Sequence, residues 1–434
     1  MAPHPPDASR TPPPPPSLLL LPAPPTPANP PSLNSAYSAP LAAVLAKLAQ
    51  SSRASREASS LIVAVACPIL SAGPPQSRTV HWEAAQSLLA GVYSIVAALC
   101  AEHGIKSDIA AGAGSVDARV VLVDHERGRS YSKAPGSSAY ETNCTPVLDL
   151  ASFATTVMPW AAVYHPSTEA GYELLSAYLA LAEGKQTFVQ KQLVAVQGGL
   201  SLSLAQSQGA SNSSRSNTTA SQDKIYNTVI LGGTFDHLHP GHKLLLHATA
   251  LLMRIPKFDS KTSSSSSSAS TPTSTYIIGI TGDAMLQNKK YAEELESWDT
   301  RARSVLSFLG TIFNTTPNPQ MAQGPSGMEM QATYVSGTVL VRCCDLQDAF
   351  GPTISEEVID AIVVSGETRG GGQAVNDRRK ERGWHALDVY EIDVLDARGL
   401  GDGSGKGGEE DFTAKISSTA IRQQRAETRA KAQI

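Results

Sequence analysis

The sequence predicts an α/β protein whose second half forms a doubly wound parallel sheet. Its 434 residues are enough for two or three domains. In the second half, short apolar, β-branched runs alternate with segments whose apolar residues recur at helical spacing. The strand-like runs are residues 228–231, 276–280, 339–343, 361–364 and 389–394. Because strands that alternate with helices form parallel sheets, we expect ligands to bind at the carboxyl ends of these strands.

The first half divides into three parts of different composition. Residues 1–59 are rich in proline, serine and alanine, and we expect them to be disordered because they bury too little apolar surface. Residues 60–198 contain strand-like and helical patterns that predict a smaller α/β domain, but no recognisable catalytic constellation. Residues 199–223 consist mainly of Ser, Asn, Gln and Thr, which predicts a flexible linker that few contacts cross.

The remaining residues, 224–434, are predicted to form the catalytic domain. Low-complexity stretches interrupt its pattern at residues 260–274, 314–327 and 399–410. Each lies between better-patterned segments, so we interpret them as surface-loop insertions, which cost little in loop-closure entropy.

Charge and cysteine content limit the classes of partner. The net charge is −4 and no long basic run occurs, which argues against nucleic acid and anionic membranes as partners. No apolar run reaches the length of a membrane-spanning helix. The five cysteines have no C-x-x-C spacing and indicate a reduced intracellular compartment, so we expect a cytoplasmic protein.

The segment 228–252 is the most informative in the chain. An apolar strand ends at Gly232 and Gly233, and a helical pattern begins near Gly241, with His239 and His242 at its start. A helix N-terminus carries unpaired N–H groups and a partial positive charge, which together bind anions. Two imidazoles there, with Lys243 beside them, are suited to the phosphates of a nucleotide. A pair of surface histidines or a stray metal pair is the alternative.

The same segment resembles the HxGH signature of the nucleotidyltransferase superfamily, in which a strand runs into GTFDxxHxGH. The matching positions are Gly233, Thr234, Phe235 and Asp236, followed by His239 and His242. The preceding strand and the GTFD residues favour the functional interpretation of the two histidines. The resemblance implies a Rossmann-like domain.

Two further segments resemble one branch of this superfamily. Residues 363–383 are similar to the V-V-S-x-E-T…G-G…N-x-x-R segment of archaeal and eukaryotic phosphopantetheine adenylyltransferases, with Glu367, Asn376 and Arg379 at matching positions. Residues 416–422 resemble the ISSTxIR element of the superfamily. The hydroxyls of that element can cap a helix and also donate to a polyphosphate.

The resemblance implies transfer of AMP from ATP to 4′-phosphopantetheine, giving dephospho-coenzyme A and pyrophosphate. It implies Mg²⁺ bound with ATP and no metal site formed by the protein. Other enzymes of coenzyme A synthesis, including a separate dephospho-coenzyme A kinase, are potential partners. The implied site residues are, for catalysis, His239, His242, Lys289, Lys290 and Arg422; for ATP, Gly232, Gly233, Phe235, Gly241, Glu367, Asn376, Arg379, Ser417, Ser418 and Thr419; for the second substrate, Thr234 and Asp236.

Three questions stay open at this stage. The sequence does not decide whether Lys289 or Lys290 contacts phosphate. A cytidylyltransferase acting on a phosphorylated alcohol shares the HxGH motif, although residues 363–383 argue against it. A scaffold for a coenzyme A synthesis complex is a further alternative, because the first half has no assigned function.

Overall fold

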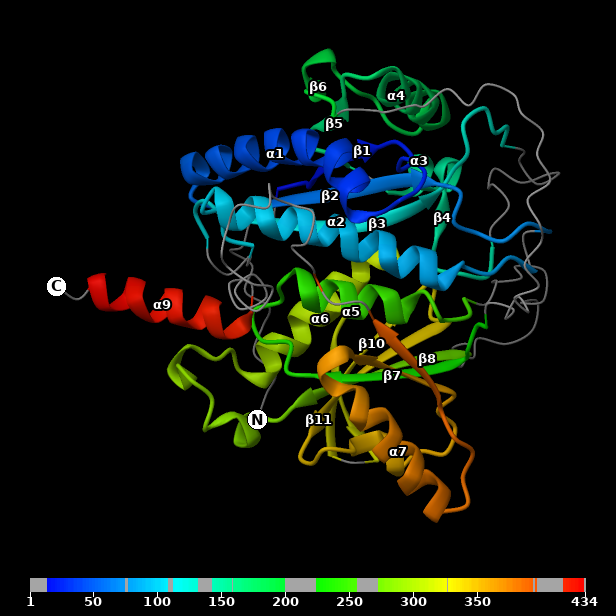
Figure 1. Ribbon diagram of the computed structural model, residues 1–434, viewed down its shortest axis with the longest axis vertical. Coiled ribbons are helices and arrows are strands. Elements are labelled where there is room, and N and C mark those ends of the chain that lie inside the picture. Colours follow the sequence, from blue (N-terminus) through cyan, green and yellow to red (C-terminus); the bar gives the residue numbers. More distant parts are fainter. Residues whose placement is uncertain are drawn as a thin grey trace, which may run out of the picture.

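The computed structural model describes residues 14–74, 77–107, 112–131, 143–157, 159–199, 224–255, 272–325, 327–392, 395 and 417–432. These residues form two α/β units, each built on its own sheet, with helices packed between the sheets (Figure 1). The expected α/β fold class is confirmed. Most of the linker at 199–223 and the stretch at 399–410 lie outside the described residues, as do residues 1–13 and most of 260–274.

The N-terminal unit is a six-stranded sheet in the order β4-β3-β2-β1-β5-β6. Its paired strands all run parallel. The strands are β1 (Ser17–Leu21), β2 (Ser59–Cys67), β3 (Val116–Asp124), β4 (Leu148–Asp149), β5 (Val163–Pro166) and β6 (Leu193–Val196). Helix α1 packs against α2, and α3 packs against α4. The helices are α1 (Pro30–Ser55), α2 (Trp82–Glu102), α3 (Leu150–Thr156) and α4 (Glu169–Ala182).

The prediction of disorder for residues 1–59 is wrong from residue 14 onward. Strand β1 lies in the middle of the sheet, between β2 and β5, and all five of its residues are buried. Helix α1 then covers the sheet, with Asn29 capping it by accepting a hydrogen bond from the Ser32 N–H at 3.0 Å. The flanking prolines dominate the composition and hide two local patterns. One is a continuous apolar run, typical of a buried parallel strand; the other is an apolar stripe at helical spacing, formed by Leu33, Tyr37, Leu41, Val44, Leu45 and Leu48.

The C-terminal unit is a seven-stranded sheet in the order β13-β12-β7-β8-β11-β10-β9. From β13 to β11 the strands are parallel, and β10 and β9 add an antiparallel hairpin. The hairpin corrects the interpretation of residues 314–327 as a loop insertion, since β9 lies within them. The strands are β7 (Thr228–Gly233), β8 (Ser274–Thr281), β9 (Gln320–Gly324), β10 (Gly327–Tyr334), β11 (Val339–Leu346), β12 (Ala361–Ser365) and β13 (Asp388–Ile392).

The helices of this unit cover both faces of its sheet. Helices α5 and α6 pack between the two sheets, whereas α7 packs below its own sheet with Val375 in a second, smaller apolar cluster (Figure 1). Helix α9 projects sideways from the body (Figure 1). The helices are α5 (Pro240–Ala250), α6 (Trp298–Ile312), α7 (Arg369–Glu381) and α9 (Ser418–Ala432).

The strand order places a topological switch point between β7 and β12. The chain builds β7, β8 and β11 in one direction, then returns to add β12 and β13 on the other side of β7. In open parallel sheets, ligands bind outside the carboxyl ends of the strands at such a point. The glycine turn after β7 and the start of α5 therefore lie where this fold binds ligands.

The two units share one core, contrary to the expectation that few contacts cross between them. Buried residues of both belong to a single apolar cluster, and α2 packs along α5. Among the described residues, α2 alone is long and apolar enough to cross a membrane, which corrects the expectation that no apolar run has that length. However, 72% of its most apolar stretch is buried inside the protein. Its composition therefore suits a core helix enclosed between two sheets.

Candidate active site

The turn between β7 and α5 brings the two motif histidines into contact. His239 is the N-cap of α5, Pro240 follows in the first turn, and His242 stands one turn on. Their rings stack with centroids 3.8 Å apart and an interplanar angle of 23°. The Phe235 ring packs beside His242 at 5.3 Å between centroids. The mouth of the helix therefore presents a pair of imidazoles held by an aromatic ring.

Two of the motif glycines are required by this packing. A Cβ at Gly241 would lie 3.2 Å from the His239 ring, and a Cβ at Gly233 would lie 3.0 Å from the Phe235 ring. Phe235 and His237 themselves adopt left-handed backbone conformations, with φ of 53° and 48°. Such strain in non-glycine residues is concentrated at functional sites. The absence of a side chain at Gly233 and Gly241 thus leaves room for the Phe235 and His239 rings.

Both histidines are held in the neutral form. Desolvation, together with the Lys243 ammonium and His237, lowers the pKa of His239 to about 3. Desolvation, together with His239 and His237, lowers the pKa of His242 well below its ordinary value. Both residues retain some exposed surface, yet the Nδ1 atom of each ring is buried and has no hydrogen-bond partner among the described residues. Buried polar atoms usually have partners, and the two rings that carry these nitrogens lie at a helix N-terminus, the kind of place that favours anions.

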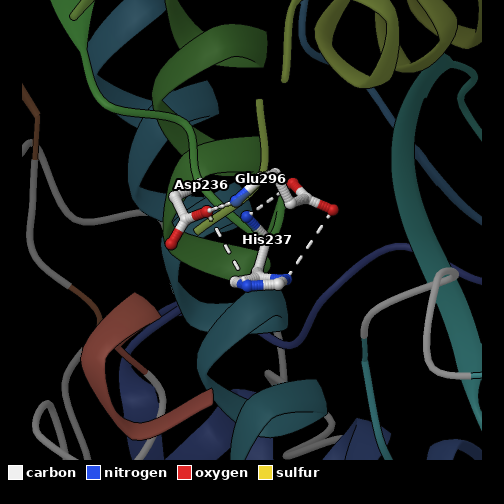
Figure 2. A group of neighbouring side chains, drawn as sticks. All are labelled: Asp236, His237 and Glu296. Atoms are coloured by element: carbon white, nitrogen blue, oxygen red, sulfur yellow. Dashed lines mark hydrogen bonds and ion pairs between the residues drawn. The ribbon is translucent and has the colours of Figure 1, made fainter. Parts of the chain in front are cut away.

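Asp236 and His237 of the same turn form a cluster with Glu296 (Figure 2). Their potential ligand atoms lie within 4.8 Å of one another, as in a metal site. Hydrogen bonds within the protein already use these atoms. The Glu296 N–H donates to Asp236 Oδ1 at 3.0 Å, the His237 N–H donates to Glu296 Oε2 at 2.9 Å, and His237 Nε2 donates to the Glu294 carbonyl at 2.9 Å. The cluster therefore joins two loops.

Arg422 connects helix α9 to the same cluster. Its guanidinium donates to Asp236 Oδ2 at 2.6 Å and to the Lys290 carbonyl at 3.0 Å, and Arg422 is almost fully buried. The Ser418 hydroxyl donates to the Asp236 carbonyl at 2.9 Å. Residues far apart in sequence, the GTFD turn and the ISST element, are thus brought together, as the paired motifs predicted. Asp236 is fully buried and is neutralised by Arg422. The predicted contacts of Asp236 with a substrate and of Arg422 with phosphate stay predictions.

Arg301 is a further residue of the site that the sequence did not single out. It is fully buried at the start of α6. It donates to the carbonyls of Thr234 at 2.7 Å, Thr281 at 2.9 Å and Glu296 at 3.0 Å, and to Asp283 Oδ1 at 2.5 Å. One guanidinium therefore fixes three loops at the carboxyl ends of β7 and β8. Only the tertiary structure reveals this, because an arginine near a helix start is usually solvated.

Lys289 and Lys290 remain exposed on the loop that follows β8. The carbonyl of Lys290 accepts the hydrogen bond from Arg422, so this loop lies against the start of α9. Neither ammonium has a partner among the described residues that would fix its position. Their predicted contact with phosphate stays a prediction for both.

Comparisons with known proteins address both halves of the chain. The family model described as "Domain of unknown function (DUF8446)" matches residues 1–202. A phosphopantetheine adenylyltransferase of Saccharomyces cerevisiae is 33% identical over 198 residues, which cover 45% of this chain and 48% of the yeast protein. A phosphopantetheine adenylyltransferase of Thermococcus kodakarensis is 30% identical over 199 residues, 46% of this chain and 86% of the archaeal protein. The chain belongs to the phosphopantetheine adenylyltransferase family.

The extent of these matches differs between relatives. The chain spans about half the length of the yeast protein, against 86% of the archaeal one. A crystal structure of a protein of unknown function from Archaeoglobus fulgidus is also similar, with a TM-score of 0.25 and 20% identity, covering 38% of this chain and 89% of that one.

The block that identified this branch of the nucleotidyltransferases contributes less to the site than expected. Arg379 is fully buried and donates to the carbonyls of Thr353, Glu356, Glu357 and His385 at 2.8–3.0 Å. The Asn376 amide both donates to and accepts from the Leu387 backbone, at 3.0 and 2.8 Å. The polar atoms of these two residues hold α7 to neighbouring loops. Their predicted contacts with ATP stay predictions. The side chain of Glu367 lies outside the described residues.

Lys243 also has a different role in this family member from the one its position suggested. It is only 1% exposed. Its Nζ donates to Asp117 Oδ1 at 2.5 Å and to the Ala118 carbonyl at 3.1 Å, both on β3 of the N-terminal unit. An ammonium so engaged does not bind phosphate. Lys243 is instead an interdomain contact.

Proposed function

We propose that this chain transfers AMP from ATP to 4′-phosphopantetheine, giving dephospho-coenzyme A and pyrophosphate in coenzyme A synthesis. The observation that carries the proposal is the stacked pair of neutral imidazoles at the start of α5, whose buried Nδ1 atoms find no hydrogen-bond partner in the part of the chain that the structure describes. They stand at the switch point of the sheet, beside a helix N-terminus that favours anions. Membership of the phosphopantetheine adenylyltransferase family supports the choice of both substrates.

The chemistry requires no nucleophile from the protein. A phosphate oxygen of 4′-phosphopantetheine attacks the α-phosphorus of ATP in line, and the bond from that phosphorus to the bridging oxygen of pyrophosphate breaks. Catalysis then consists of positioning and of stabilising the charge that grows on the leaving oxygens. A neutral imidazole carries one N–H, so each of the two rings can donate one hydrogen bond to a phosphate oxygen.

The surrounding residues take supporting roles. Thr234 and the backbone after Gly233 lie where the attacking phosphate would be oriented, and Arg301 holds the Thr234 carbonyl. Lys289 or Lys290 would add positive charge from the adjacent loop, since both are exposed. Ser417, Ser418 and Thr419 lie at the start of α9 next to the turn. Their N–H groups and the hydroxyls of Ser417 and Thr419 would donate to the β- and γ-phosphates, while the Ser418 hydroxyl donates to the Asp236 carbonyl.

Magnesium would enter with ATP as a counter-charge for the triphosphate, held chiefly by phosphate oxygens and water. The carboxylates of Asp236 and Glu296 are already engaged within the protein, Asp236 by Arg422 and Glu296 by the His237 N–H. This fits an ion that is held by phosphate oxygens and water. A protein cage for the ion is therefore not part of the proposal.

The proposal is tested by measuring pyrophosphate release by the full chain with ATP, with and without 4′-phosphopantetheine. We expect release that depends on both substrates and yields dephospho-coenzyme A. Turnover with CTP and a phosphorylated alcohol would point to a cytidylyltransferase instead. A folded chain that releases no pyrophosphate under either condition would leave a scaffolding role as the alternative.

A further inference from the structure

Helix α5, which carries the histidine pair, is enclosed on two sides. Eight of its eleven residues are buried. One side packs on β7 and β12 of its own sheet, and the other packs on α2 of the N-terminal unit. A surface helix normally has one apolar stripe and one polar face, so a helix buried on nearly all sides belongs to the interior. The N-terminal unit therefore covers the side of α5 that faces away from its own sheet.

Hydrogen bonds attach both ends of α5 to the N-terminal unit. Near the C-terminal end, Trp82 Nε1 of α2 donates to the Ala248 carbonyl at 2.8 Å. Near the N-terminal end, the Lys243 ammonium is bound by Asp117 and the Ala118 carbonyl of β3. Lys243 directly follows His242 and stands four residues after His239, so it shares the first turn of the helix with both.

The partner of Lys243 is itself held rigidly. Asp117 is 4% exposed, and Arg119 Nε donates to its second oxygen at 2.8 Å. Arg119 also donates to the Ser307 carbonyl at 3.1 Å and to Thr311 Oγ1 at 2.7 Å, both on α6. Burial alone would raise the pKa of Asp117, but Arg119 and Lys243 outweigh it and hold that pKa below its ordinary value. The carboxylate is thus a fixed, charged anchor between α5 and α6.

We propose that the N-terminal unit, whose matching family model has no assigned function, positions the active-site helix, and that Asp117 is the positioning residue. By holding Lys243, Asp117 sets the rotation and depth of the first turn of α5 and hence the placement of His239 and His242. The proposal rests on the function proposed above for the histidine pair. It gives the first half of the chain a role in the reaction without requiring it to contact a substrate.

The test uses the full chain and three variants. Asp117→Asn removes the charge that holds Lys243 and preserves the shape of the side chain. The double variant Asp117→Leu/Lys243→Met removes both charges of the Lys243–Asp117 pair and retains similar volumes, so Lys243 is not left as an unpaired buried charge. Arg119 loses its carboxylate partner but keeps its hydrogen bonds to Ser307 and Thr311 on α6. Trp82→Phe is the matched control, because it deletes the interdomain hydrogen bond at the other end of the same helix. For each, kcat, KM for ATP and the unfolding temperature are measured.

We expect Asp117→Asn to lower kcat on the order of tenfold to a hundredfold, as a small misplacement of catalytic groups does, with a smaller change in KM for ATP. The double variant should recover most of that loss. Trp82→Phe should lower the unfolding temperature and retain kcat. If Asp117→Asn does not fold, kcat of the double variant is compared with that of the wild-type chain. The proposal then requires the double variant to be folded and active.

Three results would overturn the proposal. Asp117→Asn could retain full kcat, or Trp82→Phe could lose as much kcat as Asp117→Asn, which would indicate general loosening of the interface. A folded double variant as slow as Asp117→Asn would mean that Lys243 itself serves the reaction. A wild-type chain that releases no pyrophosphate contradicts the proposed function instead. In that case the same variants are compared by their affinity for ATP, where an unchanged affinity in Asp117→Asn contradicts positioning.

Discussion

At the scale of single residues, the two motif histidines lie together at a helix start, as their spacing predicted. Several charged residues of the motifs are instead paired with one another inside the protein. His239 and His242 meet at a helix N-terminus, because an HxGH sequence across the start of a helix places them one turn apart. By contrast, Asp236 and Arg422 neutralise each other in the interior. Sequence patterns identify residue types near a site, but they do not reveal which charges are paired and buried.

His242 gives the most direct test at this scale. A hydrogen bond to the leaving oxygen strengthens only as the bond to pyrophosphate breaks, so its loss lowers kcat more than it changes KM. We expect His242→Ala to reduce kcat by about a hundredfold or more, with nearly normal ATP binding and an unchanged fold. Steady-state kinetics and ATP titration measure both quantities. Near-normal kcat in this variant would remove the histidine from the proposed mechanism.

At the scale of helices and strands, the sequence predicted the parallel strands of the C-terminal sheet but missed β1 and α1. Both missed elements lie between proline-rich segments whose composition suggests disorder. The apolar run in β1 is only four residues long, yet it supplies the centre of a six-stranded sheet. Whether such a run is a strand depends on strands β2 and β5, which are distant in sequence.

The position of β1 can be tested by deleting part of one side chain. Leu19 is fully buried and pairs with Val63 on one side and Tyr164 on the other. Leu19→Ala removes buried methyl groups and leaves a cavity, so we expect a loss of about 3 kcal/mol in the free energy of unfolding. Urea unfolding of the full chain measures this. An unchanged unfolding midpoint would mean that residues 17–21 are not part of the core.

Helix α5 also carries a buried histidine that contacts the N-terminal unit. His247 is 3% exposed, and burial lowers its pKa to about 3, although a hydrogen bond to the Val120 backbone of the N-terminal unit opposes this. In the unfolded chain this histidine takes up a proton below about pH 6.5, whereas in the folded chain it does not. Its contribution therefore destabilises the fold increasingly as the pH falls from about 6.5 toward 3.

We expect His247→Gln to reduce this acid sensitivity, because glutamine can donate to the same carbonyl and does not titrate. Between pH 7 and pH 5 the wild-type chain should lose about 2 kcal/mol more unfolding free energy than the variant. Urea unfolding at the two pH values gives the difference. Equal losses in both chains would show that His247 is protonated or exposed in the folded state.

At the scale of the whole molecule, the sequence predicted two α/β units correctly but not their relation. A polar, low-complexity segment between them suggested independence, and composition carries no information about which surfaces meet. The interface becomes visible only when α5 is placed in its sheet, where Lys243 and the Ala248 carbonyl are found to be bonded to the N-terminal unit. Helix α5 packs on its own sheet and on the N-terminal unit at the same time.

This relation predicts how the C-terminal unit behaves alone. A polypeptide of residues 224–434 would expose the face of α5 that packs on α2. It would also lose the partners of Lys243 and the edge-to-face contact of Tyr390 with Trp82, whose ring centroids lie 4.9 Å apart. We expect it to unfold at a clearly lower temperature than the full chain and to aggregate, since exposed apolar faces associate.

Adding residues 1–199 as a separate polypeptide supplies the matched control. The contacts across the interface are non-covalent, so the two pieces should associate and regain solubility, a higher unfolding temperature and pyrophosphate release without the linker. Light scattering, thermal unfolding and the two-substrate assay follow the three properties. A monomeric 224–434 polypeptide as stable and active as the full chain would show that the shared core contributes little. The interface would then be only a contact between independent domains.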